Sequence, residues 1–275
     1  MRIDAHQHFW KYQPTEFDWI GEGMEAIRRD FLPADLQREI SAAGIDGVVS
    51  MQARQSLDET RWLLELAAMN DFIKGVVGWL PLASPQVRRD MEIFAANPKL
   101  KGIRHVLQDE GDESWLHNPN FNAGIDELKE FGLVYDLLIF ERQLPAAIKF
   151  VDRHSSQIFV LDHLGKPRVK DGLLEPWNRN IRELAKRENV CCKISGLVTE
   201  ADWSAWTEVQ LQPYVETVLE AFGSSRVMFG SDWPVCRVAC DYSRWVDAVE
   251  RLTGKLSLAE RTQILGGTAS EVYRF

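Results

Sequence analysis

Two histidines stand one residue apart near the start of the chain, in the segment RIDAHQHFW. Successive side chains of an extended strand point to opposite faces, so His6 and His8 share one face while Gln7 points away from it. Paired imidazoles can bind a divalent metal ion or exchange protons near neutral pH. The segment therefore predicts half of a metal or acid–base site, and the alternative is an accident of packing.

Three more polar residues stand at the ends of apolar runs: Arg104 in GIRHVL, His163 in IFVLDHLG and Asp232 in RVMFGSDW. Taken singly, such a histidine is more often a hydrogen-bonded structural residue, and an Asp before Trp-Pro is usually a turn former. Three imidazoles and a carboxylate gathered at strand ends would be an improbable grouping if nothing bound there. We therefore predict that His6, His8, His163 and Asp232 form one functional site.

Candidate substrate-binding arginines occupy similar positions. Arg54 follows the second apolar run, where Gln52 is also polar. Arg104 alternates with His105, so only one of the two can face the interior of a sheet, and we favour Arg104. Either arginine could form an ordinary surface salt bridge, but at a strand end it is also placed to hold an anion or an oxygen. We predict Arg54 and Arg104 as substrate-binding residues.

Ten tryptophans are many for this length, and most should lie in the core. Trp10, Trp79 and Trp233 follow or end apolar runs, where an indole can stack on the apolar face of a sugar-like ring. We predict Trp10 and Trp79 as substrate-binding residues. The histidines His117 and His154 stand in loop and helix contexts and receive no role.

The elements that position these residues alternate along the chain. Stretches with helical period separate the apolar runs; one begins at Ser56 with Glu59 in a capping box, and another at Ser84 with Pro85 in its first turn. Strand then helix, repeated eight times, predicts a single-domain TIM (β/α)8 barrel over residues 1–275. A doubly wound open sheet is the alternative, although no glycine-rich phosphate fingerprint follows the first run. The eight runs are residues 2–10, 47–53, 75–82, 102–107, 133–140, 158–165, 190–197 and 226–233.

Closure of a barrel would make the first and eighth strands neighbours. The carboxyl ends of all eight strands then meet at one mouth, where the chemistry of such barrels collects. Asp232 would lie beside His6 and His8, which an open sheet does not require. The long connection over residues 11–33 carries several aromatic residues, and we expect it to cover that mouth.

Composition restricts the partners and the compartment. With 275 residues, 45% of them hydrophobic, the chain can bury a barrel-sized core, and its net charge of -9 argues against nucleic acid or an anionic membrane as partner. We expect a small-molecule ligand and a cytoplasmic protein, since no apolar run suits a membrane span or a signal peptide. The four cysteines fit reduced, mostly buried side chains, and a homo-oligomer is left open.

The segments DAHQHFW, LDHLGKP and FGSDWP resemble the amidohydrolase superfamily. The resemblance extends over nearly the whole chain to LSLAERTQILGGTASEVYRF, which looks like the family's final helix. Within the superfamily it points to a branch of TIM-barrel hydrolases that includes sugar-lactone hydrolases and 2-pyrone-4,6-dicarboxylate lactonase. KISGLVTEADW and the HFW opening look closest to the L-fuconolactonase subgroup.

The resemblance implies hydrolysis of a sugar lactone, such as an L-fuconolactone or L-galactonolactone, to the aldonic acid. Asp232 and His163 would be catalytic, Asp232 as general base on a water and His163 in stabilising the oxyanion. His6 and His8 would bind one divalent metal, zinc, with or without His163. The chain departs from many members because its fifth strand ends in LLIFER, without a histidine. Because a lactone is an activated ester, a metal-independent site is an equal alternative. Two other readings remain: a metal-dependent amidohydrolase or decarboxylase, and a binding barrel without catalysis.

Overall fold

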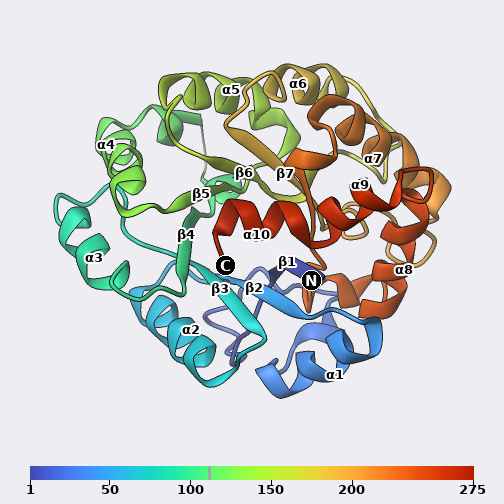
Figure 1. The fold of residues 1–275 in the computed structure, drawn as a ribbon, viewed down its shortest axis with the longest axis horizontal. Coiled ribbons are helices and arrows are strands. Elements are labelled where there is room, and N and C mark those ends of the chain that lie inside the picture. Colours follow the sequence, from blue (N-terminus) through green and yellow to red (C-terminus); the bar gives the residue numbers. More distant parts are fainter. Residues whose placement is uncertain (111–112) are drawn as a thin grey trace.

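The computed structural model describes residues 1–110 and 113–275 and contains an eight-stranded parallel sheet in the order β1 to β8 (Figure 1). Each strand pairs with the next one along the chain, as repeated βα units require. Most strands are shorter than the apolar runs, because several runs continue into the turns after them; β4 is as long as its run but begins two residues earlier. Their bounds are β1 Ile3–Gln7, β2 Gly47–Met51, β3 Ile73–Gly78, β4 Leu100–His105, β5 Val134–Leu137, β6 Phe159–Leu161, β7 Val190–Ile194 and β8 Val227–Phe229.

The sheet curls until its two edge strands meet. Beyond β8, the backbone N–H of Asp232 donates to the carbonyl of His6 at 2.7 Å, and the N–H of His8 donates to the carbonyl of Trp233 at 2.7 Å. The buried carboxylate of Asp4 in β1 accepts the backbone N–H and the hydroxyl of Ser231 at 2.8 and 2.6 Å. These bonds join β1 to the segment after β8 and confirm the predicted TIM (β/α)8 barrel.

Helices surround the strands, with bounds α1 Pro33–Ala43, α2 Leu57–Met69, α3 Val87–Phe94, α4 Pro119–Leu128, α5 Leu144–Arg153, α6 Trp177–Leu184, α7 Glu208–Phe222, α8 Tyr242–Leu252, α9 Leu258–Thr262 and α10 Thr268–Tyr273. Ser56 caps α2, but the predicted capping box is incomplete, because the carboxylate of Glu59 accepts the backbone N–H groups of Ala53 and Arg54 instead. The next helix begins at Val87, later than Ser84 suggested, because residues 82–86 still form turns. No helix in the described part of the chain has the length and apolar character of a membrane span.

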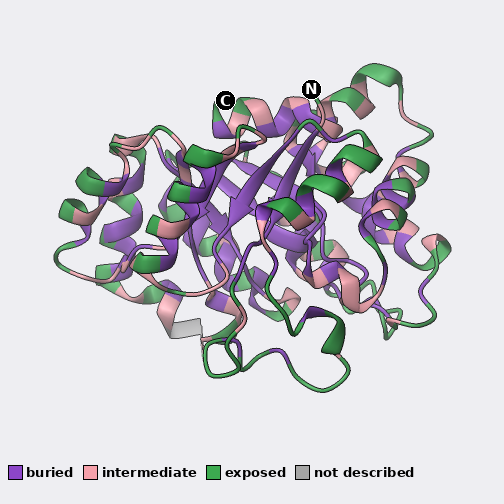
Figure 2. Cartoon of the chain, turned by 90° about the horizontal axis from the view of Figure 1, so that it is seen from below, coloured by how far each residue is buried: buried purple, intermediate pink, exposed green. Residues whose placement is uncertain are grey.

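The two ends of the barrel are built differently. Helix α10 crosses the end where the strands begin (Figure 1), and its Tyr273 joins an apolar cluster inside the barrel with Ile3, Val49 and Val160. Long, partly exposed loops gather at the opposite end, while the strands between are buried (Figure 2). Because apolar side chains fill the barrel near the end where the strands begin, the polar side chains of a site are expected at the end where the strands finish.

The four cysteines are buried and free.

Candidate active site

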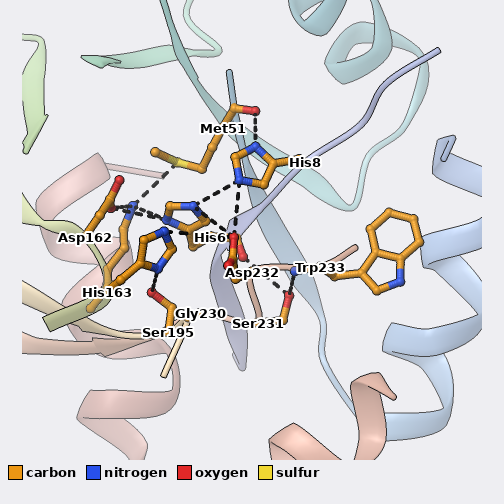
Figure 3. Close-up of polar contacts among 12 residues, drawn as sticks. His6, His8, Met51, Asp162, His163, Ser195, Gly230, Ser231, Asp232 and Trp233 are labelled. Atoms are coloured by element: carbon orange, nitrogen blue, oxygen red, sulfur yellow. Dashed lines mark hydrogen bonds and ion pairs between the residues drawn. The ribbon is translucent and has the colours of Figure 1, made fainter. Parts of the chain in front are cut away.

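Three imidazoles and one carboxylate converge at the carboxyl end of the strands (Figure 3). Asp232 Oδ1 lies 3.4 Å from His8 Nε2, 3.7 Å from His6 Nε2 and 4.0 Å from His163 Nε2, and all four side chains are buried. The structure thus brings together the four residues that the sequence selected from three separate segments. Their elements are β1 with the residue after it, the turn after β6 and the turn after β8.

Hydrogen bonds fix the orientation of the two paired imidazoles. His6 Nδ1 lies 3.2 Å from Asp162 Oδ1, and His8 Nδ1 lies 3.1 Å from the carbonyl oxygen of Met51. Since both partners only accept, each Nδ1 carries the proton and each Nε2 presents a lone pair. Burial lowers the pKa of His6 and of His8, so both rings are neutral at neutral pH. The two Nε2 atoms face each other at 3.2 Å, a geometry that calls for a cation or a proton donor beside them.

A left-handed turn after β6 presents the third imidazole. Residues 163–166 have φ values of 53°, 54°, 68° and 49°, and only one of them is glycine. Left-handed backbone costs about 1–2 kcal/mol for each non-glycine residue, so the surrounding fold must hold this turn. His163 Nδ1 lies 2.8 Å from the hydroxyl of Ser195, and Gly196, itself at φ +62°, leaves room where a Cβ would lie 2.5 Å from the ring. Asp232 also has a positive φ of 57°.

Protonation at the site follows from burial and from these neighbours. Burial alone would raise the pKa of Asp232, but the imidazoles of His163, His8 and His6 outweigh it, and the pKa is lowered. Burial lowers the pKa of His163 to about 4. At neutral pH the site therefore holds a carboxylate surrounded by neutral imidazoles, which suits the acceptance of a proton from water.

A buried ionic network lies beneath the imidazoles, and the sequence reasoning missed it. Lys193 Nζ in β7 contacts Asp136 Oδ2 in β5 and lies 3.0 Å from Asp162 Oδ1, the carboxylate that holds His6. The hydroxyl of Tyr273 donates to Asp136 Oδ2 at 2.7 Å. The sequence could have indicated Lys193, because a lysine inside an apolar run such as VCCKI is rarely buried without partners. It could also have indicated Asp162, which stands next to His163 in the LDHLG segment.

Arg104, rather than His105, points into the barrel. Its Nη1 donates to Asp162 Oδ2 at 2.9 Å and its Nε to Gln52 Oε1 at 2.9 Å. His105 lies on the helix side, where its ring stacks on Trp115 with centroids 5.0 Å apart and its Nε2 lies 2.7 Å from Glu110 Oε1. The alternation along β4 decides this orientation, as the sequence indicated.

A cavity of about 640 Å³ opens above these residues. Trp10 and Arg54 line it, whereas Trp79, also predicted to bind substrate, is not among the lining residues, and its indole N–H donates to His105 Nδ1 at 3.3 Å. Trp233 turns away from the imidazoles (Figure 3). Residues of the connection over 11–33 also line the cavity, which confirms that this segment covers the mouth. The principal lining residues are His8, Trp10, Glu16, Trp19, Arg54, Arg104, Leu138, His163, Lys166 and Asp232.

The donor set fits one zinc ion. His6 Nε2, His8 Nε2 and Asp232 Oδ1 are separated by 3.2, 3.4 and 3.7 Å. Ligand atoms about 2.1 Å from a tetrahedral zinc lie about 3.4 Å apart, and two imidazoles with a carboxylate are ordinary zinc ligands. A second grouping of His6, Asp162 and His163 fits less well, because Arg104 and Lys193 already neutralise Asp162.

Comparison with known proteins identifies the family. The amidohydrolase family model matches residues 3–275. The chain belongs to the amidohydrolase family. This amidohydrolase is 42% identical to an L-fucono-1,5-lactonase of Burkholderia multivorans, over 99% of this chain and 96% of that protein. It is 38% identical to an L-fucono-1,5-lactonase of Burkholderia ambifaria, over 99% of this chain and 95% of that protein.

A solved structure extends the comparison from sequence to geometry. The amidohydrolase superposes on a Burkholderia multivorans amidohydrolase with bound zinc at a TM-score of 0.97, with 42% identity, covering 100% of this chain and 99% of that one. The two chains therefore share one barrel over their whole length.

Proposed function

We propose that this amidohydrolase hydrolyses a sugar lactone, L-fucono-1,5-lactone or a close relative, to the aldonic acid. The observation that carries the proposal is the ionised Asp232 within 3.4–4.0 Å of three neutral imidazoles at the base of a cavity of about 640 Å³. Full-length identity of 38–42% to two L-fucono-1,5-lactonases supports the same reaction. The alternative amidohydrolase and decarboxylase chemistries have no comparable support.

Asp232 carries the proton through the reaction. Its carboxylate accepts a proton from a water molecule, whose oxygen attacks the lactone carbonyl. When the tetrahedral intermediate collapses, the bond to the ring oxygen breaks and Asp232 returns the proton to that oxygen. The product is an aldonic acid that ionises at neutral pH, so each turnover releases one proton to solution.

His163 and Arg104 stabilise the charge that develops on the carbonyl oxygen. His163 lines the cavity, and we propose that it donates to this oxygen. His6, His8 and Asp232 would hold a zinc ion, which as a Lewis acid would polarise the carbonyl and lower the pKa of a bound water. Without zinc, His163 and Arg104 would have to stabilise this oxygen alone, because His6 and His8 present lone pairs at Nε2 and cannot donate to it. Arg104 Nη1 lies 3.3 Å from His6 Nε2, beside the paired imidazoles.

The upper cavity suits a sugar ring. Trp10 offers an apolar face, and Arg54 offers donors for hydroxyl groups. Arg54 also pairs with Glu16 of the covering segment, with Nη1 2.6 Å from Oε1. We propose Trp10, Arg54 and Arg104 as the residues that hold the lactone, within one catalytic domain over residues 1–275 that acts in the cytoplasm.

A proton-release assay tests both the lactonase function and its dependence on zinc. Protein stripped with a chelator would receive L-fucono-1,5-lactone or L-galactonolactone, with and without added zinc, while a pH indicator follows the reaction. Activity that returns only with zinc supports a metal on His6 and His8, and activity that persists after stripping supports a metal-free acid–base site. If neither sample releases protons faster than a blank without protein, the lactonase function is overturned.

A further inference from the structure

One cation at the cavity has no part in the reaction described above. Lys166 lies in the same left-handed turn as His163, and its backbone N–H donates to the His163 carbonyl at 2.8 Å. In such a tight turn, residues three apart lie on the same side. His163 and Lys166 accordingly both line the cavity. The strained turn therefore delivers two functional groups to one place.

Lys166 differs from the other two cations that line the cavity. Arg54 is held by Glu16 at 2.6 Å, and Arg104 by Asp162 at 2.9 Å. The carboxylate nearest to Lys166 Nζ is Glu200 Oε1 at 3.7 Å, which is longer than a hydrogen bond. Among the described residues that line the cavity, Lys166 is thus the cation with no carboxylate within hydrogen-bond distance, and its Nζ lies 5.3 Å from the ring centroid of Phe140. Its side chain is only 16% exposed, so water screens its charge incompletely.

The proposed reaction creates the group that such a cation binds. A sugar lactone is neutral, whereas the opened product carries a carboxylate. We propose that Lys166 forms a carboxylate-binding subsite that holds the aldonate product, an inference that rests on the proposed function. The ammonium donates to a carboxylate oxygen, and the charge of Glu200 opposes this binding from the other side.

Calorimetric titration with the aldonate, L-fuconate, tests the subsite without turnover. The matched neutral ligand is L-fucitol, in which CH2OH replaces the carboxylate. In one fixed metal state, Lys166→Met should weaken L-fuconate binding about 10- to 100-fold, the effect of losing a charge-assisted hydrogen bond, and leave L-fucitol binding within about threefold. Lys166→Arg should retain most of the L-fuconate affinity, and Glu200→Gln should increase it.

The outcomes separate this subsite from the lactonase function. Equal L-fuconate affinity in wild type and Lys166→Met, or an equal loss for both ligands, overturns the subsite even if lactone turnover is normal. Conversely, charge-dependent binding that requires Lys166 supports the subsite even if proton release shows no lactonase activity. Lys166→Arg keeps the charge on a slightly longer side chain. If Lys166→Met fails to fold, Glu200→Gln still tests the subsite, because an L-fuconate affinity equal to that of wild type would overturn it.

Discussion

The mouth and the floor of the barrel hold the same kinds of polar side chain, but the distances between those side chains differ. The floor comprises Asp136, Asp162, Lys193 and Tyr273, in which Lys193 Nζ lies 3.0 Å from Asp162 and Tyr273 donates to Asp136 at 2.7 Å. At the mouth, Asp232 stands 3.4–4.0 Å from its imidazoles, and Lys166 stands 3.7 Å from Glu200.

This difference in spacing distinguishes residues that support the site from residues that can react or bind a ligand. Floor groups contact one another at hydrogen-bond distance and so fix one another's positions, although Asp136 Oδ1 has no hydrogen-bond partner among the described residues. At the mouth, Asp232 and Lys166 are held slightly apart from their partners, and both side chains line the cavity. Asp162 connects the two regions: it accepts from Lys193 in the floor and from Arg104 at the cavity, and it fixes the tautomer of His6. The floor thus prepares the mouth, as outer hydrogen bonds commonly do around metal-binding histidines.

The largest effect should come from the mouth carboxylate. Asp232→Asn keeps the shape but removes the proton acceptor, so kcat for lactone hydrolysis should fall about 10²- to 10⁴-fold. Because the folded state lowers the pKa of Asp232, its charge also stabilises the fold, so circular dichroism should first show that the variant is folded. A stopped-flow proton-release assay would measure kcat at saturating zinc. A loss smaller than threefold would assign the base to another group.

Substitutions in the floor should lower the free energy of unfolding. Lys193→Met leaves Asp136 and Asp162 buried without their cation, and the free energy of unfolding should fall by about 3–5 kcal/mol. The matched control, Tyr273→Phe, removes one hydrogen bond to Asp136 and should cost about 1 kcal/mol. Urea denaturation followed by circular dichroism measures both. Equal losses in the two variants would show that the charge of Lys193 does not hold the floor.

The sequence predicted the mouth better than the floor, for a physical reason. Period-two alternation places His6 and His8 on one face, and barrel closure brings Asp232 to them, so local rules and topology suffice there. The orientation of Trp79 depends on the path of the loop after β3. The end of β6 depends on the left-handed turn at residues 163–166, a backbone conformation that no local preference favours. Lys193 lies in a strand that reads as apolar, and its partners come from β5 and the turn after β6. Pairing of that kind is set by tertiary structure.

The smallest of the three predicted effects concerns Glu59, a buried carboxylate in α2 beside the loop that carries Arg54. Burial raises the pKa of Glu59 from 4.5 to about 7, although the N–H groups of Ala53 and Arg54 oppose the shift. Because the folded state favours the protonated form, the stabilisation is complete below pH 4.5 and is lost as pH rises to about 7. Glu59→Gln cannot ionise, so between these pH values wild type should lose about 3 kcal/mol of unfolding free energy relative to the variant. Urea denaturation of both proteins at pH 4.5, 6 and 7.5 measures this difference. Parallel pH profiles would mean that Glu59 titrates normally, and the loop that carries Arg54 would then be anchored by an ordinary ionised carboxylate.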